Sequence, residues 1–256
     1  MFHVKHSDAE RCIPVDDAAG EIESLVRWAA EFGLSLSHDQ AANLLRHLDL
    51  VLSANHRLNL TRITTREEAL IAHIVDSLAA VPHLSGFSSA DEVADVGTGA
   101  GYPGIPIATL LPCRLTLVES IGKKAAFLQE ATEALGRGDQ IRVFAGRAEE
   151  LATASPGAFA AVTARAVAAL PSLVELASPL LREGGMLIAL KGAPEEGELV
   201  AGKAAARLVG MDEVERTEYL LPGLGHRRTI VKYERTGRPT RKLPRRTGMA
   251  QRRPLA

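Results

Sequence analysis

The sequence of 256 residues lacks the features that mark several classes of protein. It has no apolar run near the roughly 20 residues that a membrane-spanning helix needs. Residues 1–12 carry several charged side chains and hold no apolar stretch of the kind found in a secretory signal. Its two cysteines, Cys12 and Cys113, form no metal-ligand pattern. We therefore expect a cytoplasmic protein with reduced thiols, no membrane partner and no metal.

Acidic and basic residues are unevenly distributed along the chain, although the net charge is only −1. From Lys232 onward there are nine basic residues and one acid, Glu234, while the rest of the chain holds 21 basic and 30 acidic residues. A basic end on an acidic body favours contact with a polyanion such as nucleic acid. A solvated tail that aids solubility would have the same composition, so both interpretations stay open. The sequence predicts a basic, flexible tail over residues 235–256.

Three amphipathic helices are predicted before the first strand. Apolar residues recur at helical spacing over residues 18–33, 37–54 and 66–81, and the third helix is expected to end before Pro82. We expect residues 1–85 to form an N-terminal helical cap that packs on the main domain.

Strands and helices alternate from Asp91 onward, which is typical of a parallel sheet with helices on both faces. The last two strands, about 213–221 and 226–234, follow each other with only a turn-rich link between them. A Rossmann-like, doubly wound α/β sheet that ends in an antiparallel hairpin is expected of a class I methyltransferase, and we assign residues 86–234 to it. The other predicted strands cover 92–97, 114–119, 140–145, 159–164 and 185–191, and the helices about 103–111, 122–136, 147–153, 171–182 and 195–209.

A glycine-rich loop follows the first of these strands and reads Asp95-Val96-Gly97-Thr98-Gly99-Ala100-Gly101. Its glycines let the backbone turn sharply and approach a ligand at the carboxyl end of the strand. The spacing from Gly99 to Gly104 also satisfies the GxGxxG dinucleotide pattern. Both kinds of ligand need an acid for a ribose diol at the end of the second strand, where Glu119 stands. The loop alone therefore leaves a methyltransferase and a nicotinamide-dependent oxidoreductase open.

Residues on either side of the loop favour the methyltransferase. Asp95 is the acid typical of methyltransferases, placed to orient the loop and, through water, to reach a methionine ammonium. Pro103 and Pro106 fall in the first turn of the next helix and lack amide protons. A pyrophosphate would bind those amides, whereas a sulfonium cofactor carries no phosphate.

Seven segments of the chain, in order between about residues 20 and 234, resemble the ribosomal RNA small-subunit methyltransferase G family (RsmG, or glucose-inhibited division protein B). The string GTGAGYPGIP at 97–106 is the most specific of them. The resemblance implies a class I fold, S-adenosylmethionine as methyl donor, and methylation of N7 of one guanine in small-subunit (16S) rRNA. The other segments are Asn59-Leu60-Thr61, His73-x-x-Asp76-Ser77-Leu78, Glu119-Ser120-x-Gly122-Lys123-Lys124, Gly146-Arg147-Ala148-Glu149-Glu150, Ala164-Arg165-Ala166 and Leu190-Lys191-Gly192.

The resemblance also implies where the cofactor binds. Gly97 would lie against the methionine part, Glu119 would take the ribose, and Ala148-Glu149 would flank the adenine. Tyr102 stands where the family often has Leu or Phe, and the long basic tail departs from the shortest members. The full set of expected cofactor residues is Asp95, Gly97, Gly99, Gly101, Tyr102, Glu119, Ala148, Glu149 and Arg165.

Four residues are candidates for the side of the site that meets the target guanine: Asn59, His73, Asp76 and Arg165. His73 and Asp76 are three apart on a predicted helix and share a face, so they serve equally well as a packing pair between cap and sheet. Guanine N7 already carries a free lone pair, so we expect no catalytic acid or base.

The expected partner is small-subunit rRNA or the assembled ribosomal subunit, with the chain acting as a monomer. A non-catalytic RNA-binding assembly factor with a relic cofactor pocket is the remaining alternative.

Overall fold

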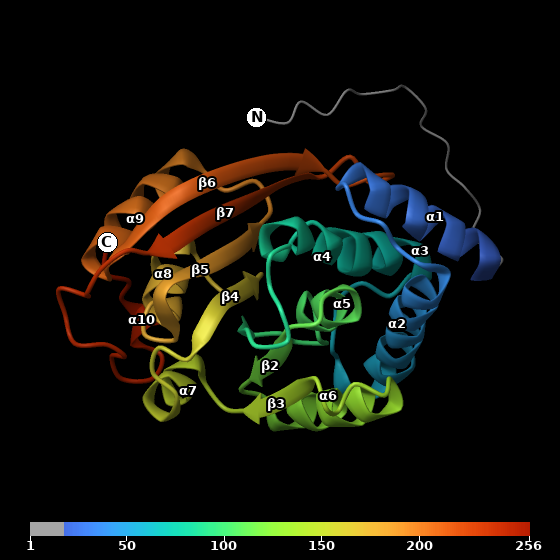
Figure 1. The fold of residues 1–256 in the computed structure, drawn as a ribbon, viewed down its shortest axis with the longest axis horizontal. Helices are drawn as coiled ribbons and strands as arrows, with labels where there is room; N and C mark the ends of the chain where they lie inside the picture. The colour runs from blue at the N-terminus through green and yellow to red at the C-terminus, as the bar shows by residue number, and fades with distance from the viewer. Residues whose placement is uncertain (1–17) are drawn as a thin grey trace.

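Seven strands form one sheet with helices on both faces in the computed structural model, which describes residues 18–256 (Figure 1). The strand order is β3-β2-β1-β4-β5-β7-β6. Neighbours among β1 to β5 pair in parallel, and β7 runs antiparallel to both β5 and β6. The predicted doubly wound α/β sheet with a closing hairpin is thus confirmed. The strands are β1 Glu92–Val96, β2 Arg114–Glu119, β3 Ile141–Ala145, β4 Phe159–Arg165, β5 Leu181–Lys191, β6 Met211–Leu220 and β7 Arg227–Arg235.

Alternating side chains along the strands build two apolar cores, one on each face of the sheet. In β1, Val93 joins the core that includes residues of α2, α5 and α6, whereas Ala94 and Val96 join the core that includes residues of α8 and α9. The helices after the cap are α5 Gly104–Leu110, α6 Gly122–Ala134, α7 Ala148–Ala154, α8 Leu170–Ala177, α9 Glu196–Leu208 and α10 Met249–Arg252.

The N-terminal helices share a core with the sheet. Leu44 and Leu48 of α2 are fully buried in the same cluster as Ile107 of α5. Helix α2 begins with a capping box, in which Ser37 Oγ accepts from the N–H of Gln40 at 3.2 Å and the Gln40 side chain accepts from the Ser37 N–H. The elements of this region are α1 Ala18–Glu31, α2 His38–Leu58, α3 Arg66–Ala69, the π-helix Leu70–Val75, α4 Asp76–Leu78 and the 3₁₀-helix Val81–Leu84.

The single helix that the sequence predicts over 66–81 is divided in the structure. Its middle turn, Leu70–Val75, is a π-helix, and Pro82 lies inside the following 3₁₀-helix instead of just after a helix end. The carbonyl of Ala72 accepts a hydrogen bond from Arg165 at 2.8 Å. Arg165 belongs to β4, so the sequence pattern of residues 66–81 does not reveal this hydrogen bond.

The basic C-terminal segment, residues 236–256, follows β7 and packs on the domain. The Thr240 N–H donates to the Leu208 carbonyl at 2.9 Å, and Arg245 pairs with Glu175 of α8. The sequence predicts a flexible tail for 235–256, whereas the structure gives this segment specific partners. The difference arises because Glu175 is buried under the segment, which composition cannot reveal.

Candidate functional site

The glycine loop leaves the carboxyl end of β1 and enters α5, and Asp95 holds its two ends together. One oxygen of the fully buried Asp95 carboxylate accepts from the N–H of Gly104 at 2.9 Å, and the other accepts from the Thr163 hydroxyl of β4 at 2.9 Å. Burial raises the pKa of Asp95 to about 6, against the opposing effect of these hydrogen bonds. The carboxylate therefore connects β1 with β4 and with the start of α5.

Two glycines of the loop meet different surroundings. Gly101 has a φ of +98°, a backbone conformation that L side chains rarely adopt, and a Cβ there would also lie 2.5 Å from Cδ1 of Ile105, so the fold of the loop itself accounts for this glycine. Gly99 has a φ of +61°, and a Cβ there would meet nothing closer than the Gly97 carbonyl at 4.0 Å. The loop is thus open beside Gly99, and Gly97 is exposed.

Glu119 ends β2 beside this opening. Its side chain is buried, and its two oxygens accept from the N–H groups of Gly99 at 3.1 Å and Ile121 at 2.8 Å. A carboxylate has about four acceptor positions, so lone pairs remain for a vicinal diol. The geometry brings the predicted ribose acid and the glycine loop together.

Ala148 and Glu149 form the first turn of α7, directly beyond β3. The β3 residue Ala145 pairs with Glu119 across the sheet, which places this turn beside Glu119. Both residues are buried, and Oε1 of Glu149 accepts from the N–H of Gly248 at 2.7 Å. The Glu149 carboxylate therefore contacts the C-terminal segment.

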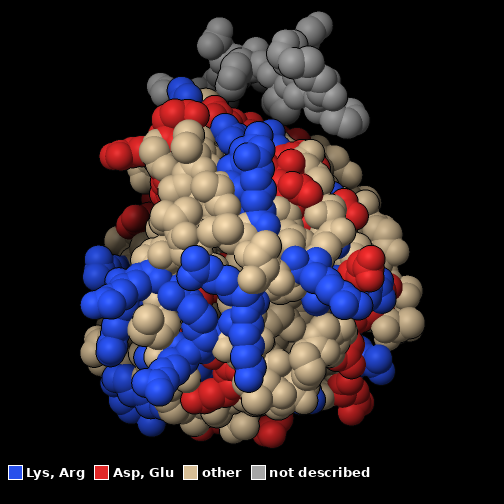
Figure 2. Space-filling view, turned by 90° about the vertical axis from the view of Figure 1, so that its left-hand side faces the viewer, with Lys and Arg blue, Asp and Glu red and all other residues tan. Residues whose placement is uncertain are grey.

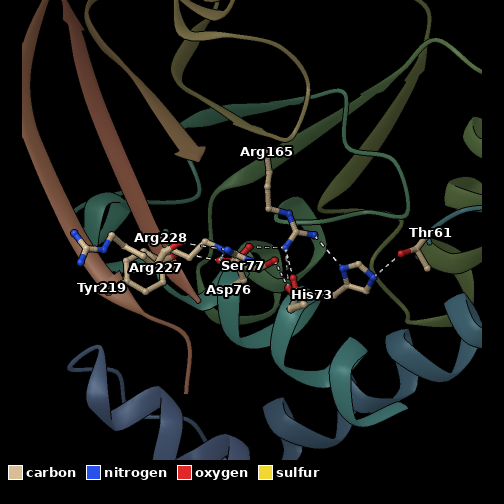
Figure 3. A network of polar contacts seen from close by, with 9 residues as sticks. Thr61, His73, Asp76, Ser77, Arg165, Tyr219, Arg227 and Arg228 are labelled. Carbon is tan, nitrogen blue, oxygen red and sulfur yellow. Dashed lines mark hydrogen bonds and ion pairs between the residues drawn. The ribbon is translucent and has the colours of Figure 1, made fainter. Parts of the chain in front are cut away.

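Arg165 reaches from the end of β4 to the turn that carries His73 and Asp76 (Figure 3). Its Nη1 donates to the Ala72 carbonyl at 2.8 Å and to the Asp76 carboxylate at 3.0 Å. Asp76 also accepts from the Tyr219 hydroxyl at 2.9 Å and from Nε of Arg228 at 3.1 Å. Asp76 thus connects the helical cap with β4 and with the hairpin of β6 and β7.

His73 is uncharged in this network. Burial, followed by the positive charge of Arg165, lowers the pKa of His73 to about 3. Its Nδ1 lies 3.5 Å from Nη2 of Arg165, and its Nε2 lies 2.9 Å from Oγ1 of Thr61. Because a guanidinium only donates, we assign the proton to Nε2, which then donates to Thr61.

Tyr102 fills the space between the loop and the cap. Its ring stacks on His73 with centroids 4.9 Å apart, faces His47 at 4.5 Å, and lies 5.4 Å from the guanidinium carbon of Arg165. Burial lowers the pKa of His47 to about 4 and raises that of Tyr102. The buried Tyr102 hydroxyl makes no hydrogen bond with the described part of the chain. Tyr102 therefore packs the glycine loop against His47 and His73 of the helical cap.

Most of the predicted residues lie at or beside the carboxyl ends of β1 to β4. Asn59 does not join the polar contacts of His73, Asp76 and Arg165. It caps α2 with a φ of +52°, a conformation that Asn tolerates better than most residues. Tyr219 and Arg228 were missed because an isolated Tyr and Arg on a hairpin carry no signal in one sequence. Thr163 could have been found, since it lies opposite Asp95 once β1 and β4 are paired.

These residues fit S-adenosylmethionine better than a phosphate-bearing ligand. The open side of Gly99, the held carboxylate of Glu119 and the first turn of α7 follow one another along the ends of β1, β2 and β3. They suit a methionine, a ribose and an adenine in that order. The N–H of Gly104 is engaged by Asp95, so it does not face a pyrophosphate.

Within residues 18–256, no group of three side chains is arranged to hold a metal ion, and no helix has the length and apolar character to cross a membrane.

Comparisons of the sequence with known proteins identify one family. The family profile described as rRNA small subunit methyltransferase G (GidB) matches residues 40–222. A ribosomal RNA small subunit methyltransferase G of Deinococcus radiodurans is 41% identical over 239 residues, which cover 91% of this chain and 92% of that protein. One of the same name from Symbiobacterium thermophilum is 39% identical and covers 93% of this chain and all of its own length.

Solved structures agree on the fold. An O-methyltransferase from Bacillus cereus, in complex with S-adenosylhomocysteine, superposes with a TM-score of 0.51 at 17% identity over 73% of this chain and 90% of its own. A geranyl diphosphate C-methyltransferase from Streptomyces coelicolor superposes with a TM-score of 0.52 at 14% identity over 62% of this chain and 76% of its own. At these identities the likeness concerns the sheet and its helices alone.

Proposed function

Because this chain belongs to the rRNA small subunit methyltransferase G family, we propose that it transfers the methyl group of S-adenosylmethionine to N7 of one guanine in small-subunit (16S) rRNA in the cytoplasm. The observation that carries the proposal within the structure is the pairing of Glu119 with the open glycine loop at the ends of β2 and β1. Family membership and the antiparallel hairpin both argue against the nicotinamide-dependent oxidoreductase.

The chain's own residues would hold the cofactor along the carboxyl ends of β1, β2 and β3. Gly97 and Gly99 would lie against the methionine part, Glu119 would accept from the ribose hydroxyls, and Ala148 with Glu149 would flank the adenine. Asp95, Gly101 and Tyr102 would act through the loop, because each is buried against protein in the structure. When bound, the sulfonium supplies an electrophilic methyl group.

No proton has to be removed before the reaction. Guanine N7 presents a lone pair, so the rate gain comes from holding that nitrogen in line with the methyl carbon, an effect worth up to about 7–11 kcal/mol in ideal cases. Arg165 and His73 are suited to this positioning because their contacts fix both side chains. With a pKa of about 3, His73 is neutral at pH 7 and would not repel the cationic product.

RNA is expected to meet the basic face of the domain. Lys and Arg side chains gather on the face that carries the C-terminal segment (Figure 2). Arg238, Arg246, Arg252 and Arg253 of this segment are exposed. Such side chains would contact phosphates and give an affinity that falls with salt. N7 is hidden in the deep groove of a regular RNA duplex, so the target guanine would be in a loop or splayed from its stack.

Two binding experiments, one assay and one sedimentation measurement test the proposal. Calorimetry should show S-adenosylhomocysteine binding and no NAD binding. Tritium from labelled S-adenosylmethionine should transfer to rRNA or to small subunits, and Glu119→Gln should raise KM for the donor more than it lowers kcat. RNA binding without methyl transfer would favour the assembly-factor alternative. Sedimentation should show a monomer.

A further inference from the structure

Two adjacent arginines of the C-terminal segment point in different directions. Nε and Nη2 of Arg245 donate to the two oxygens of Glu175 at 2.5 and 2.6 Å, and the Glu175 side chain is only 2% exposed. The next residue, Arg246, is exposed. A two-point Arg–carboxylate pair that is shielded from water is among the stronger polar contacts in proteins. Arg245 therefore anchors the segment on α8.

Beyond this anchor the segment reaches α7. The Gly248 N–H donates to Glu149 at 2.7 Å, and the Ala250 carbonyl accepts from the Ser172 hydroxyl of α8 at 2.8 Å. Ala250 is buried in the apolar core that also holds Ala148 and residues of α8. Figure 1 shows α10 beside α8, with α7 next to them. The segment thus links α8 to the first turn of α7.

That first turn lies at the adenine end of the proposed cofactor site. The Gly146 N–H donates to the Glu119 carbonyl at 3.0 Å, so the chain entering α7 lies directly beside the ribose acid. A ligand with its ribose on Glu119 and its methionine at the loop on β1 must extend its base toward the end of β3. Ala148 and Glu149 are the residues that it meets there.

We propose that Arg245 is a positioning residue for the cofactor. By anchoring the C-terminal segment on Glu175, it keeps Gly248 against Glu149 and fixes the turn that flanks the adenine. The inference rests on the proposed function. It gives the basic segment a second role, in which its inward face shapes the cofactor site while its exposed arginines face the RNA.

The test compares the two neighbouring arginines by calorimetry with S-adenosylhomocysteine on the full chain. Arg245→Ala should weaken binding by roughly three- to thirtyfold, the range typical of residues that act through a packed network. Arg246→Ala should leave the affinity for S-adenosylhomocysteine unchanged. Arg245→Lys, which keeps the charge, should restore part of the loss. In steady-state assays Arg245→Ala should raise KM for the donor with kcat at saturation unchanged.

Hydrogen exchange provides a readout that does not depend on activity. Peptides covering 246–250 should exchange faster in Arg245→Ala, while those of β1 and β4 keep the wild-type rate. If Arg245→Ala fails to fold, Ser172→Ala removes one hydrogen bond from the same segment and should show the same changes to a smaller degree. Faster exchange with wild-type affinity would overturn the inference, as would unchanged exchange. Failure of the proposed function would look different, because the wild-type chain itself would not bind the ligand.

Discussion

Asp76 of the helical cap and Arg165 of β4 form an ion pair, with 3.0 Å between Oδ2 and Nη1, although 89 residues separate them in the sequence. Both side chains are largely buried, at 6% and 14% exposure. The same carboxylate also accepts from Tyr219 and Arg228 of the hairpin. Of the two interpretations that the sequence leaves open for Asp76, these contacts favour the packing role, since donors from three strands already bind three of its roughly four acceptor positions.

Replacing this acid should cost much stability. Asp76→Asn leaves the charges of Arg165 and Arg228 without a counter-charge, and removing one partner of a buried pair costs about 3 kcal/mol or more. Urea unfolding measures the difference. Arg227→Ala serves as the control, because Arg227 and Glu218 form an exposed pair, and it should change the free energy of unfolding by less than about 0.5 kcal/mol. Equal effects of the two variants would contradict the role given to Asp76.

The hydroxyl of Tyr102 should not contribute to stability. It is buried without a hydrogen bond in the described chain, so Tyr102→Phe removes a desolvated polar group and should leave stability unchanged or raise it by about 1 kcal/mol. Tyr102→Ala removes the stacking ring and should cost about 3–5 kcal/mol. Thermal unfolding of both variants is the measurement. A large loss in the Phe variant would show that the hydroxyl has a partner.

Asp95 should make stability depend on pH in an identifiable way. Burial raises its pKa in the folded state to about 6 from 3.8, so the folded protein holds this proton more tightly than the unfolded chain does. The stabilisation is complete below about pH 4 and is lost as the pH rises to about 6. Asp95→Asn keeps an acceptor for the Gly104 N–H and does not titrate. The unfolding midpoint of the wild type should therefore fall relative to the variant between pH 4 and 6, and parallel profiles would contradict the assignment.

Much of the sheet could be predicted from sequence because each strand and helix carries its own periodicity. The loop, Asp95 and Glu119 were also predictable, since a ligand at the end of a strand demands those residue types at that spacing. The π-helix and the packing of the C-terminal segment were not, and the residues that contact each of them are distant in sequence. Arg165 meets the carbonyl of Ala72, and Glu175 meets Arg245. In one sequence Glu175 is indistinguishable from an ordinary helical acid.

Four of the exposed arginines of the C-terminal segment should contribute to the salt dependence of RNA binding. Replacing Arg238, Arg246, Arg252 and Arg253 with Ser should reduce the slope of log K against log salt by about 0.7 to 0.9 for each arginine that contacts a phosphate. These substitutions leave the Arg245–Glu175 anchor in place, so the fold is kept. Arg114 begins β2 and lies at the opposite end of the strands from the loop. Arg114→Ser removes one positive charge there and should leave the slope unchanged. An unaltered slope in the fourfold variant would place RNA elsewhere.

The central claim is that the protein methylates N7 of one guanine in small-subunit rRNA. Small-subunit rRNA and assembled subunits that lack the modification should be treated with the protein and S-adenosylmethionine, and the methylated nucleotide mapped by reduction and strand scission, which detect N7-methylguanine. The account predicts one new N7-methylguanine in the small-subunit rRNA, absent when the donor is omitted. A methyl group at another atom, or RNA binding with no methyl transfer, would contradict it.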